Sequence, residues 1–181
     1  MKNINTKADI KTADDNIIRL MQLSENDIEF LSGKGGSINC AVISSGCKLN
    51  QFESSQFEEI FKRMNINVVD FRGSDGNIDL FLVNTCTVTE KADTETDKII
   101  RKIRKKYPHS RLLLTGCSAQ LNKIKFSGIP GIKLMDNIQK TEVLKISSQR
   151  FPDIALNQKK NEALFKNTGG MRFGMFLLYN S

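Results

Sequence analysis

Three of the four cysteines in this 181-residue chain stand directly after short apolar runs. They are Cys47 after Ala41-Val-Ile-Ser-Ser-Gly46, Cys86 after Leu80-Phe-Leu-Val-Asn-Thr85, and Cys117 after Leu112-Leu-Leu-Thr-Gly116. Each is followed by a segment with the composition of a helix. In an open parallel α/β sheet the carboxyl ends of the strands share one edge, where ligands bind. We therefore expect the three thiols to meet in one site.

Three thiols in one place suit an iron–sulfur cluster better than zinc. Structural zinc takes four ligands, often in Cys-x-x-Cys pairs, and the chain has no such pair. His109, the only histidine, follows a proline in a turn and is expected to be solvated. Three thiolates on a four-iron cluster leave one iron open to an exogenous ligand. A redox disulfide between two of the cysteines is the alternative, and it would not need the third.

The residues around these cysteines predict how reactive each one is. Gly46 and Gly116 leave room for the backbone to approach a ligand closely. A helix that begins beside a cysteine lowers the pKa of its thiol, so we expect Cys47, Cys86 and Cys117 to favour the thiolate. The fourth cysteine, Cys40, lies early in its strand. It is expected to be a small buried hydrophobe, as unpaired cysteines commonly are.

The elements that must position this site alternate between strand and helix patterns. Expected strands cover residues 38–44, 67–71, 80–84, 111–115 and 131–135, and expected helices cover 50–64, 92–107, 118–126 and 138–146. This alternation predicts an α/β fold. Its core is an open parallel sheet of about five strands with helices on both faces, flavodoxin- or Rossmann-like.

The alternating pattern divides the chain into three parts. Residues 38–150 form the domain, and residues 1–37 precede it as an extension with a helix and a Gly-rich link. That link precedes a strand, so it is not a phosphate-binding loop, which follows one. Residues 151–181 break the pattern and are expected to be a linker and the start of a further domain.

The charge of the chain indicates which partners it could bind. The net charge is +7 and the pI about 9.3, which suits a nucleic-acid partner without establishing one. Six of the basic residues surround Ile99, Ile100 and Ile103: Lys98, Arg101, Lys102, Arg104, Lys105 and Lys106. They form either a solvated helix face or a surface that contacts phosphates. No aromatic residue interleaves with them, so base stacking is not expected there.

The termini and the cysteine content predict a cytoplasmic protein. The chain has no run of ~18 apolar residues, and its N-terminus has no apolar segment typical of a secretory signal. Four cysteines in a reducing compartment are more often thiols or metal ligands than disulfides. We expect no membrane partner and no DNA partner, and the sequence does not indicate an oligomeric state.

Three motifs resemble the N-terminal domain of the radical-SAM methylthiotransferases over about residues 38–150. They are Gly46-Cys-Lys-Leu-Asn-Gln-Phe-Glu-Ser54, Asn84-Thr-Cys-Thr-Val-Thr89 and Thr115-Gly-Cys-Ser-Ala-Gln120. The resemblance implies that Cys47, Cys86 and Cys117 bind an auxiliary 4Fe–4S cluster and that Cys40 is not a ligand. The motifs are most similar to the branch that acts on N6-threonylcarbamoyladenosine at position 37 of tRNA. That branch adds a methylthio group to C2 of the adenine.

The chain departs from this family in two respects, since neither the radical-SAM domain nor the C-terminal RNA-binding domain of the family is present in these residues. The family's radical-SAM domain carries a Cys-x-x-x-Cys-x-x-Cys motif for a second 4Fe–4S cluster and S-adenosylmethionine, and these 181 residues have none. We therefore expect a truncated chain with no catalytic residue of its own, which binds tRNA weakly and does not cleave S-adenosylmethionine. Two alternatives stay open: a non-catalytic module that binds a cluster or tRNA, and a small dithiol redox protein.

Overall fold

Five parallel strands form one sheet in the computed structural model, which describes residues 38–45, 47–71, 76–86 and 90–151 together with Ile17 and Met21. The strands are β1 (Asn39–Ser44), β2 (Asn67–Val68), β3 (Leu80–Thr85), β4 (Arg111–Gly116) and β5 (Ile132–Met135). Their order is β2-β1-β3-β4-β5, and every neighbouring pair is parallel. This is the flavodoxin-like order. The predicted α/β class and the five-stranded parallel sheet are confirmed.

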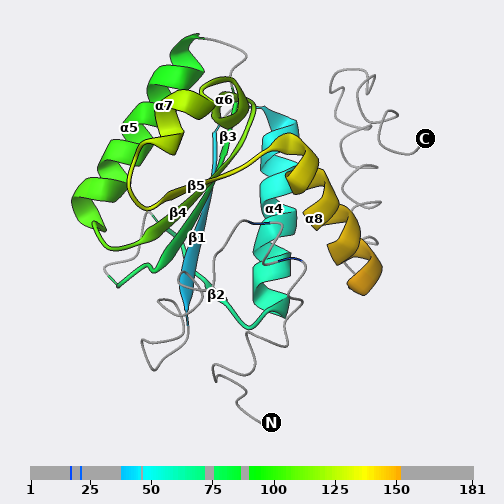
Figure 1. The fold of residues 1–181 in the computed structure, drawn as a ribbon. Coiled ribbons are helices and arrows are strands. Elements are labelled where there is room, and N and C mark those ends of the chain that lie inside the picture. Colours follow the sequence, from blue (N-terminus) through cyan, green and yellow to red (C-terminus); the bar gives the residue numbers. More distant parts are fainter. Residues whose placement is uncertain are drawn as a thin grey trace.

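Helices lie on both faces of the sheet (Figure 1). One face carries α4 (Lys48–Arg63) and α8 (Asn137–Arg150). The other carries α5 (Glu90–Lys106), α6 (Cys117–Leu121) and α7 (Lys123–Ser127).

The side chains of β3 alternate between these two layers. Leu80 and Leu82 belong to the same buried cluster as Phe57 of α4. Phe81 belongs to a second buried cluster, together with Ile103 of α5. The central strand is thus buried on both sides, as its continuous apolar run predicts.

The register of the sheet aligns the last residues of the three strands that precede the cysteines. Ser44 of β1 pairs with Asn84 of β3, and Asn84 pairs with Thr115 of β4. β1 and β3 are neighbours although β2 lies between them in sequence, so the chain changes direction across the sheet there. Ligands of open α/β sheets bind outside the strand ends at such a switch point.

Two predicted elements differ from the observed ones. The single helix expected over 118–126 is two short helices, α6 and α7, with Asn122 between them. The strand expected over 67–71 ends at Val68, because β2 is an edge strand that pairs with β1 only through Asn39–Asn67 and Cys40–Val68 among the described residues.

Local signals account for the ends of the two helices on the first face. Asn65, just after α4, has a positive φ of 57°, a conformation that asparagine tolerates at a helix end. Asp136 and Gln139 form a reciprocal capping box at the start of α8.

Most of both terminal segments lies outside the described residues. This applies to the expected N-terminal helix, the Gly-rich link and residues 152–181. Ile17 and Met21 are fully buried and belong to the core cluster that contains Phe57 and Phe61 of α4. Within the described part of the chain, no helix is long and apolar enough to cross a membrane.

Candidate metal centre at the carboxyl edge of the sheet

The fold places three of the four cysteines at the carboxyl edge. Cys47 is the N-cap residue of α4, Cys86 directly follows β3, and Cys117 is the first residue of α6. Cys47 and Cys117 are exposed, Cys86 is buried, and none of them forms a disulfide. Cys40 instead lies in β1 with no exposed surface, and its burial raises its thiol pKa far above the usual range. The prediction that Cys40 is a buried hydrophobe is confirmed.

The pKa of Cys117 responds to the other two cysteines of the edge. Although Cys117 is exposed as a residue, its thiol is partly desolvated, and this is the main cause that raises its pKa above the ordinary value. Negative charge on Cys86 or Cys47 raises it further, so both lie within electrostatic reach of Cys117. The expectation that a helix start makes this cysteine a thiolate is wrong. α6 has only five residues, so its dipole is small, and burial outweighs it.

The donor set suits an iron–sulfur cluster. Within the described residues, no group of three or more His, Cys, Asp or Glu side chains is placed to hold a metal ion. Three thiols from three separate elements, none in a disulfide, are the ligand type that iron–sulfur clusters use. His109 is exposed in the turn after α5, as expected. The assignment of Cys47, Cys86 and Cys117 as cluster ligands stays a prediction.

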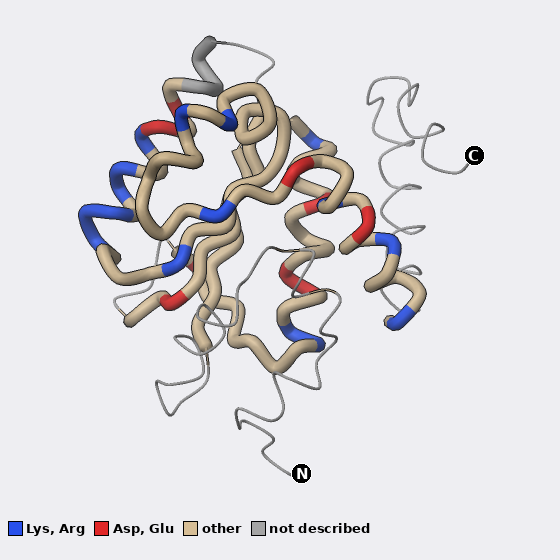
Figure 2. The backbone as a smooth tube through the Cα atoms, viewed as in Figure 1, with Lys and Arg blue, Asp and Glu red and all other residues tan. Residues whose placement is uncertain are grey.

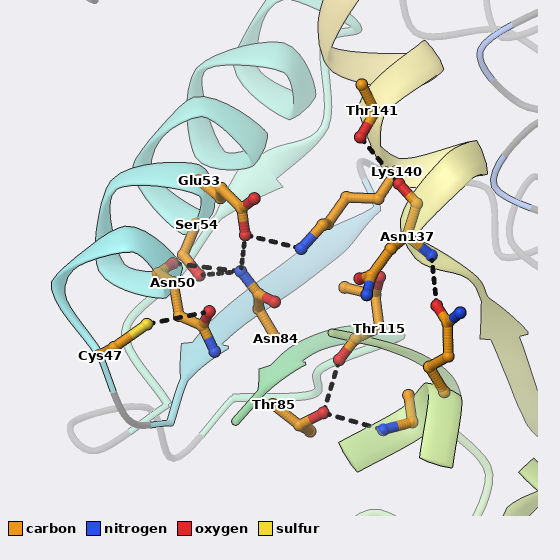
Figure 3. A network of polar contacts seen from close by, with 12 residues as sticks. Cys47, Asn50, Glu53, Ser54, Asn84, Thr85, Thr115, Asn137, Lys140 and Thr141 are labelled. Atoms are coloured by element: carbon orange, nitrogen blue, oxygen red, sulfur yellow. Dashed lines mark hydrogen bonds and ion pairs between the residues drawn. The ribbon is translucent and has the colours of Figure 1, made fainter. Parts of the chain in front are cut away.

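A polar network lies beside Cys47 at this edge of the sheet (Figure 3). Asn84, fully buried at the end of β3, donates from Nδ2 to the Asn50 carbonyl and to Glu53 Oε2, both at 3.1 Å. The same amide lies 3.5 Å from Ser54 Oγ. Glu53 Oε2 also accepts from Lys140 Nζ at 2.8 Å, which joins α4 to α8. The network thus links β3 to both helices of one face.

Asn50 extends the network to the first cysteine. Cys47 Sγ donates to Asn50 Oδ1 at 3.4 Å, and Asn50 Nδ2 donates to the Ser45 carbonyl at 3.0 Å. Asn50 is itself buried in the first turn of α4. It therefore fixes the place of Cys47 relative to the end of β1.

Thr85 ties the other two cysteines to each other. Its hydroxyl donates to the Thr115 carbonyl at 2.7 Å and accepts from the Ala119 N–H at 3.1 Å. Thr85 precedes Cys86, and Ala119 lies in the same turn as Cys117. One hydroxyl therefore holds the end of β3, the end of β4 and the start of α6 in register.

Gly116 is required by the close contact between β3 and β4. Its φ is +94°, and a Cβ added there would lie 2.2 Å from the Thr85 carbonyl oxygen. The observed close approach is to the neighbouring strand, and the predicted approach to a ligand stays a prediction. Gly46 lies outside the described residues.

Sequence reasoning missed the residues that support the cysteines. Asn50, Glu53 and Asn84 stand inside the recognised motifs, so their closeness to Cys47 and Cys86 in sequence was the available signal. No such signal pointed to Lys140. It lies in α8, a helix with an ordinary mixture of charges, 87 residues from its partner Glu53.

Basic residues gather on the opposite layer, along α5 (Figure 2). Lys98, Arg101, Lys102 and Lys105 are exposed there, while Ile100 and Ile103 are buried below them. Arg104 was expected on this face but does not lie on it. Its Nη1 donates to the Ser110 carbonyl at 2.8 Å. Burial and the nearby Arg111 charge lower the pKa of its guanidinium group.

Comparison with known proteins gives the family. The model of the uncharacterized protein family UPF0004 matches residues 39–135, more than half of the chain, and spans all three cysteines of the edge. The chain belongs to this family. No solved structure matches it.

Named relatives of this UPF0004 chain are methylthiotransferases. The threonylcarbamoyladenosine tRNA methylthiotransferase MtaB of Bacillus subtilis (strain 168) is 31% identical over 54% of this chain and 21% of its own length. The MtaB of Treponema pallidum (strain Nichols) is 37% identical over 42% of this chain and 16% of its own length. The tRNA-2-methylthio-N(6)-dimethylallyladenosine synthase of Dehalococcoides mccartyi is 35% identical over 40% of this chain and 17% of its own length. The resemblance to methylthiotransferases is confirmed, and the chain spans about a fifth of these relatives.

Proposed function

We propose that this chain is the auxiliary cluster-binding part of a cytoplasmic tRNA methylthiotransferase that adds a methylthio group to C2 of N6-threonylcarbamoyladenosine at position 37 of tRNA. Cys47, Cys86 and Cys117 are the proposed ligands of a 4Fe–4S cluster. The placement of these cysteines at one sheet edge, each after a different strand, supports the proposal. The names of the relatives MtaB supply the tRNA substrate.

The chain's own residues prepare the site for such a cluster. Asn50 holds Cys47, and Thr85 holds the segments that carry Cys86 and Cys117. When bound, a cluster with three thiolate ligands supplies one iron that is open to an exogenous sulfur ligand. The three thiols come from separate parts of the chain. The carboxyl edge of the sheet must therefore be folded before all three can bind one cluster.

Anaerobic reconstitution with iron and sulfide tests the cluster. The wild-type chain is expected to bind about four irons, and alanine at Cys47, Cys86 or Cys117 should abolish this binding. Cys40→Ala is the control and should retain the iron, because Cys40 is buried in β1 away from the edge. Iron lost from Cys40→Ala as completely as from the others, or none bound by the wild type, would refute the assignment.

A second experiment concerns catalysis by residues 1–181. In this family the radical comes from S-adenosylmethionine bound through a Cys-x-x-x-Cys-x-x-Cys motif, which these residues lack. A protein scaffold does not supply that chemistry by itself. We expect no 5′-deoxyadenosine above background in an anaerobic assay with reductant, S-adenosylmethionine and tRNA. Its appearance would show that these residues suffice for S-adenosylmethionine cleavage.

We propose further that the exposed face of α5 contacts tRNA phosphates. Lys98, Arg101 and Lys105 lie at helical spacing on this face and are exposed. The contact is electrostatic, so binding is weak and falls steeply with salt.

The test replaces Lys98, Arg101 and Lys105 together with glutamine and measures tRNA binding against salt. The logarithm of the affinity should depend less steeply on the logarithm of the salt concentration, by about 0.7–0.9 for each phosphate that is no longer neutralised. A matched control replaces three exposed basic residues of the opposite layer, Lys62, Lys145 and Arg150, and changes the net charge equally. Equal weakening by both sets would show that only net charge matters.

A further inference from the structure

One half-buried aromatic side chain, Phe71, has no part in the cysteine site. It follows the edge strand β2, beyond Val68, where that strand ends. It packs against the buried cluster of the α5 layer, which contains Phe81 and Tyr107. A single apolar side chain at the surface is ordinary in itself, so its significance depends on the groups that surround it.

Two buried rings fix the orientation of Phe71. Its ring centroid lies 5.6 Å from that of Phe81, with an angle of 85° between the ring planes. The ring centroid of Tyr107 lies 6.3 Å away, at an angle of 54°. Phe81 has no exposed surface and Tyr107 is 7% exposed, so both rings belong to the core. Edge-to-face contacts of this kind are favourable, and they hold Phe71 in place while part of its surface stays exposed.

The basic face of α5 reaches this ring. Lys102 is exposed, and its Nζ lies 5.3 Å from the ring centroid of Phe71. Lys98 and Lys105 neighbour Lys102 on the helix surface at helical spacing, and both are exposed. No aromatic residue stands among these charges in the sequence, so base stacking was not expected there. The fold supplies a ring from a segment that is distant in sequence.

A ring beside several exposed cations suits a nucleotide whose base is unpaired. Basic side chains contact the phosphates, and the ring stacks on the base, which a duplex keeps inside its own stack. Stacking of a base on an aromatic ring is stronger than the contact of a cation with an exposed ring. A base can therefore displace Lys102 from Phe71, and the ammonium group then stays close enough to contact the adjoining phosphate.

We propose that Phe71 and the basic face of α5 form a binding site for an unpaired RNA nucleotide. The base stacks on Phe71, and the phosphates on either side contact Lys98, Lys102 and Lys105. That this RNA is tRNA rests on the proposed function, whereas the preference for an unpaired nucleotide rests on the ring and the charges beside it.

The site lies away from the cysteine edge. α5 begins at Glu90, shortly after Cys86. A helix rises about 1.5 Å per residue, so Lys102 lies about 18 Å along α5 from its start. The stacked base is therefore a different one from any base presented to the cysteines, and one RNA can contact both places.

The test measures binding of the full chain, without a cluster, to a short single-stranded RNA and to the same RNA annealed to its complement. Fluorescence anisotropy gives the affinity over a range of salt concentrations. Phe71→Leu keeps an apolar side chain but removes the ring, so it should weaken binding of the single strand about fivefold or more. Stacking releases no counterions, so the salt dependence should not change. Binding of the duplex should be unaffected.

Two further variants control for the ring and for its place. Phe71→Tyr keeps an aromatic ring and should retain most of the affinity for the single strand. Phe151→Leu makes the same change at a half-buried phenylalanine in the other layer, where it packs against the core cluster of α4 and α8. This variant should bind both RNA forms as the wild type does.

A folded Phe71→Leu chain that binds the single strand as tightly as the wild type would overturn the inference. An equal loss with the single strand and the duplex would overturn it too. If Phe71→Leu does not fold, ultraviolet cross-linking of the wild-type chain to the single strand, mapped by peptide mass spectrometry, takes its place. Phe71 should be among the cross-linked residues, and cross-links confined to other segments would be equally decisive against it.

The same measurements separate this inference from the proposed function. A wild-type chain that binds neither RNA would refute the phosphate contact of α5 together with the stacking. Binding that loses salt dependence when Lys98, Arg101 and Lys105 are replaced with glutamine, but does not respond to Phe71→Leu, would refute the stacking alone.

Discussion

The interior of β3 and β4 differs sharply from the carboxyl edge of the same two strands. In the interior, Phe81, Leu82, Leu113 and Leu114 have no exposed surface and pack against helices on both faces. At the edge the strands are equally buried, but their residues are polar: Asn84, Thr85 and Thr115 also have no exposed surface. The change from apolar to polar takes place between adjacent residues within a buried strand.

The two regions also differ in how well their groups are satisfied. Asn84 Oδ1 and Thr115 Oγ1 are buried and have no hydrogen-bond partner within the described part of the chain. Buried polar atoms without partners cost stability, so most are paired in native proteins. An apolar edge would avoid this cost. The interior therefore contributes to stability, whereas the two unpartnered polar atoms at the edge reduce it.

The largest expected contrast is in thiol reactivity. Cys40 is fully buried with a raised pKa, so iodoacetamide should modify it only when the chain opens. Cys47 is exposed and should react at least about 10³-fold faster, given the usual free energy of opening a core. The measurement is alkylation of the native chain followed by peptide mass spectrometry. Equal rates for Cys40 and Cys47 would remove the distinction between interior and edge.

The pH dependence of Cys117 sharpens the same contrast. Its thiol pKa is raised, so the protonated form persists at neutral pH and the thiolate gains population only as pH rises past the ordinary value of 9.0. Alkylation of Cys117 should therefore keep accelerating above that pH. A rate already at its plateau at pH 8 would mean that the thiolate is favoured after all.

Substitution at Gly116 tests how tightly the edge is built. Gly116→Ala places a methyl group 2.2 Å from a backbone oxygen, at a φ of +94° that alanine rarely adopts. Strain at such a φ costs about 1–3 kcal/mol, and the clash adds to it, so we expect a loss of about 3 kcal/mol or more in urea unfolding. Gly128→Ala is the matched control, because nothing lies within 4 Å of its added Cβ. Similar stability of both variants would show that the edge can relax.

Leu82→Ala tests the interior in return. Leu82 is fully buried in the core cluster beneath α4, and its truncation is expected to cost about 2–5 kcal/mol of unfolding free energy. Iron binding at the cysteine site should not decrease with this loss of stability. The folded variant should bind iron as the wild type does, whereas Cys86→Ala should lose iron at a smaller cost in stability. Iron lost from folded Leu82→Ala would tie the site to the core.

The sequence predicted the sheet and the position of the cysteines for the same physical reason. Runs such as Leu80–Val83 and Leu112–Leu114 are long enough for a buried strand, and strand–helix alternation leaves a parallel sheet as the ordinary solution. Residues that directly follow such strands must lie at one edge. Placing Cys47, Cys86 and Cys117 there needed no knowledge of side-chain packing.

The remaining features depend on contacts distant in sequence. The pKa of Cys117 is set by burial and by Lys140, neither of which is visible in the residues around it. Arg104 has the same spacing as its exposed neighbours, yet it turns toward the Ser110 carbonyl in the following turn. The pairing of Glu53 with Lys140 depends on how α8 lies beside α4, which periodicity does not determine.

The smallest expected effects come from two threonines on adjacent strands of the edge. Thr85→Val removes a hydroxyl that both donates and accepts, and it leaves the Thr115 carbonyl and the Ala119 N–H without that partner. Unmade hydrogen bonds of buried groups cost about 1–3 kcal/mol, so urea unfolding should show a loss of this size.

Thr115→Val is the matched change, because Thr115 is equally buried but its Oγ1 has no partner among the described residues. Deleting this hydroxyl removes a polar atom whose burial is uncompensated, so the cluster-free chain should keep its stability or gain up to about 1 kcal/mol. The opposite order, with Thr115→Val the more harmful change, would mean that the Thr115 hydroxyl does have a partner. The edge would then be better satisfied than its contacts indicate, and the contrast with the interior would rest on the cysteines alone.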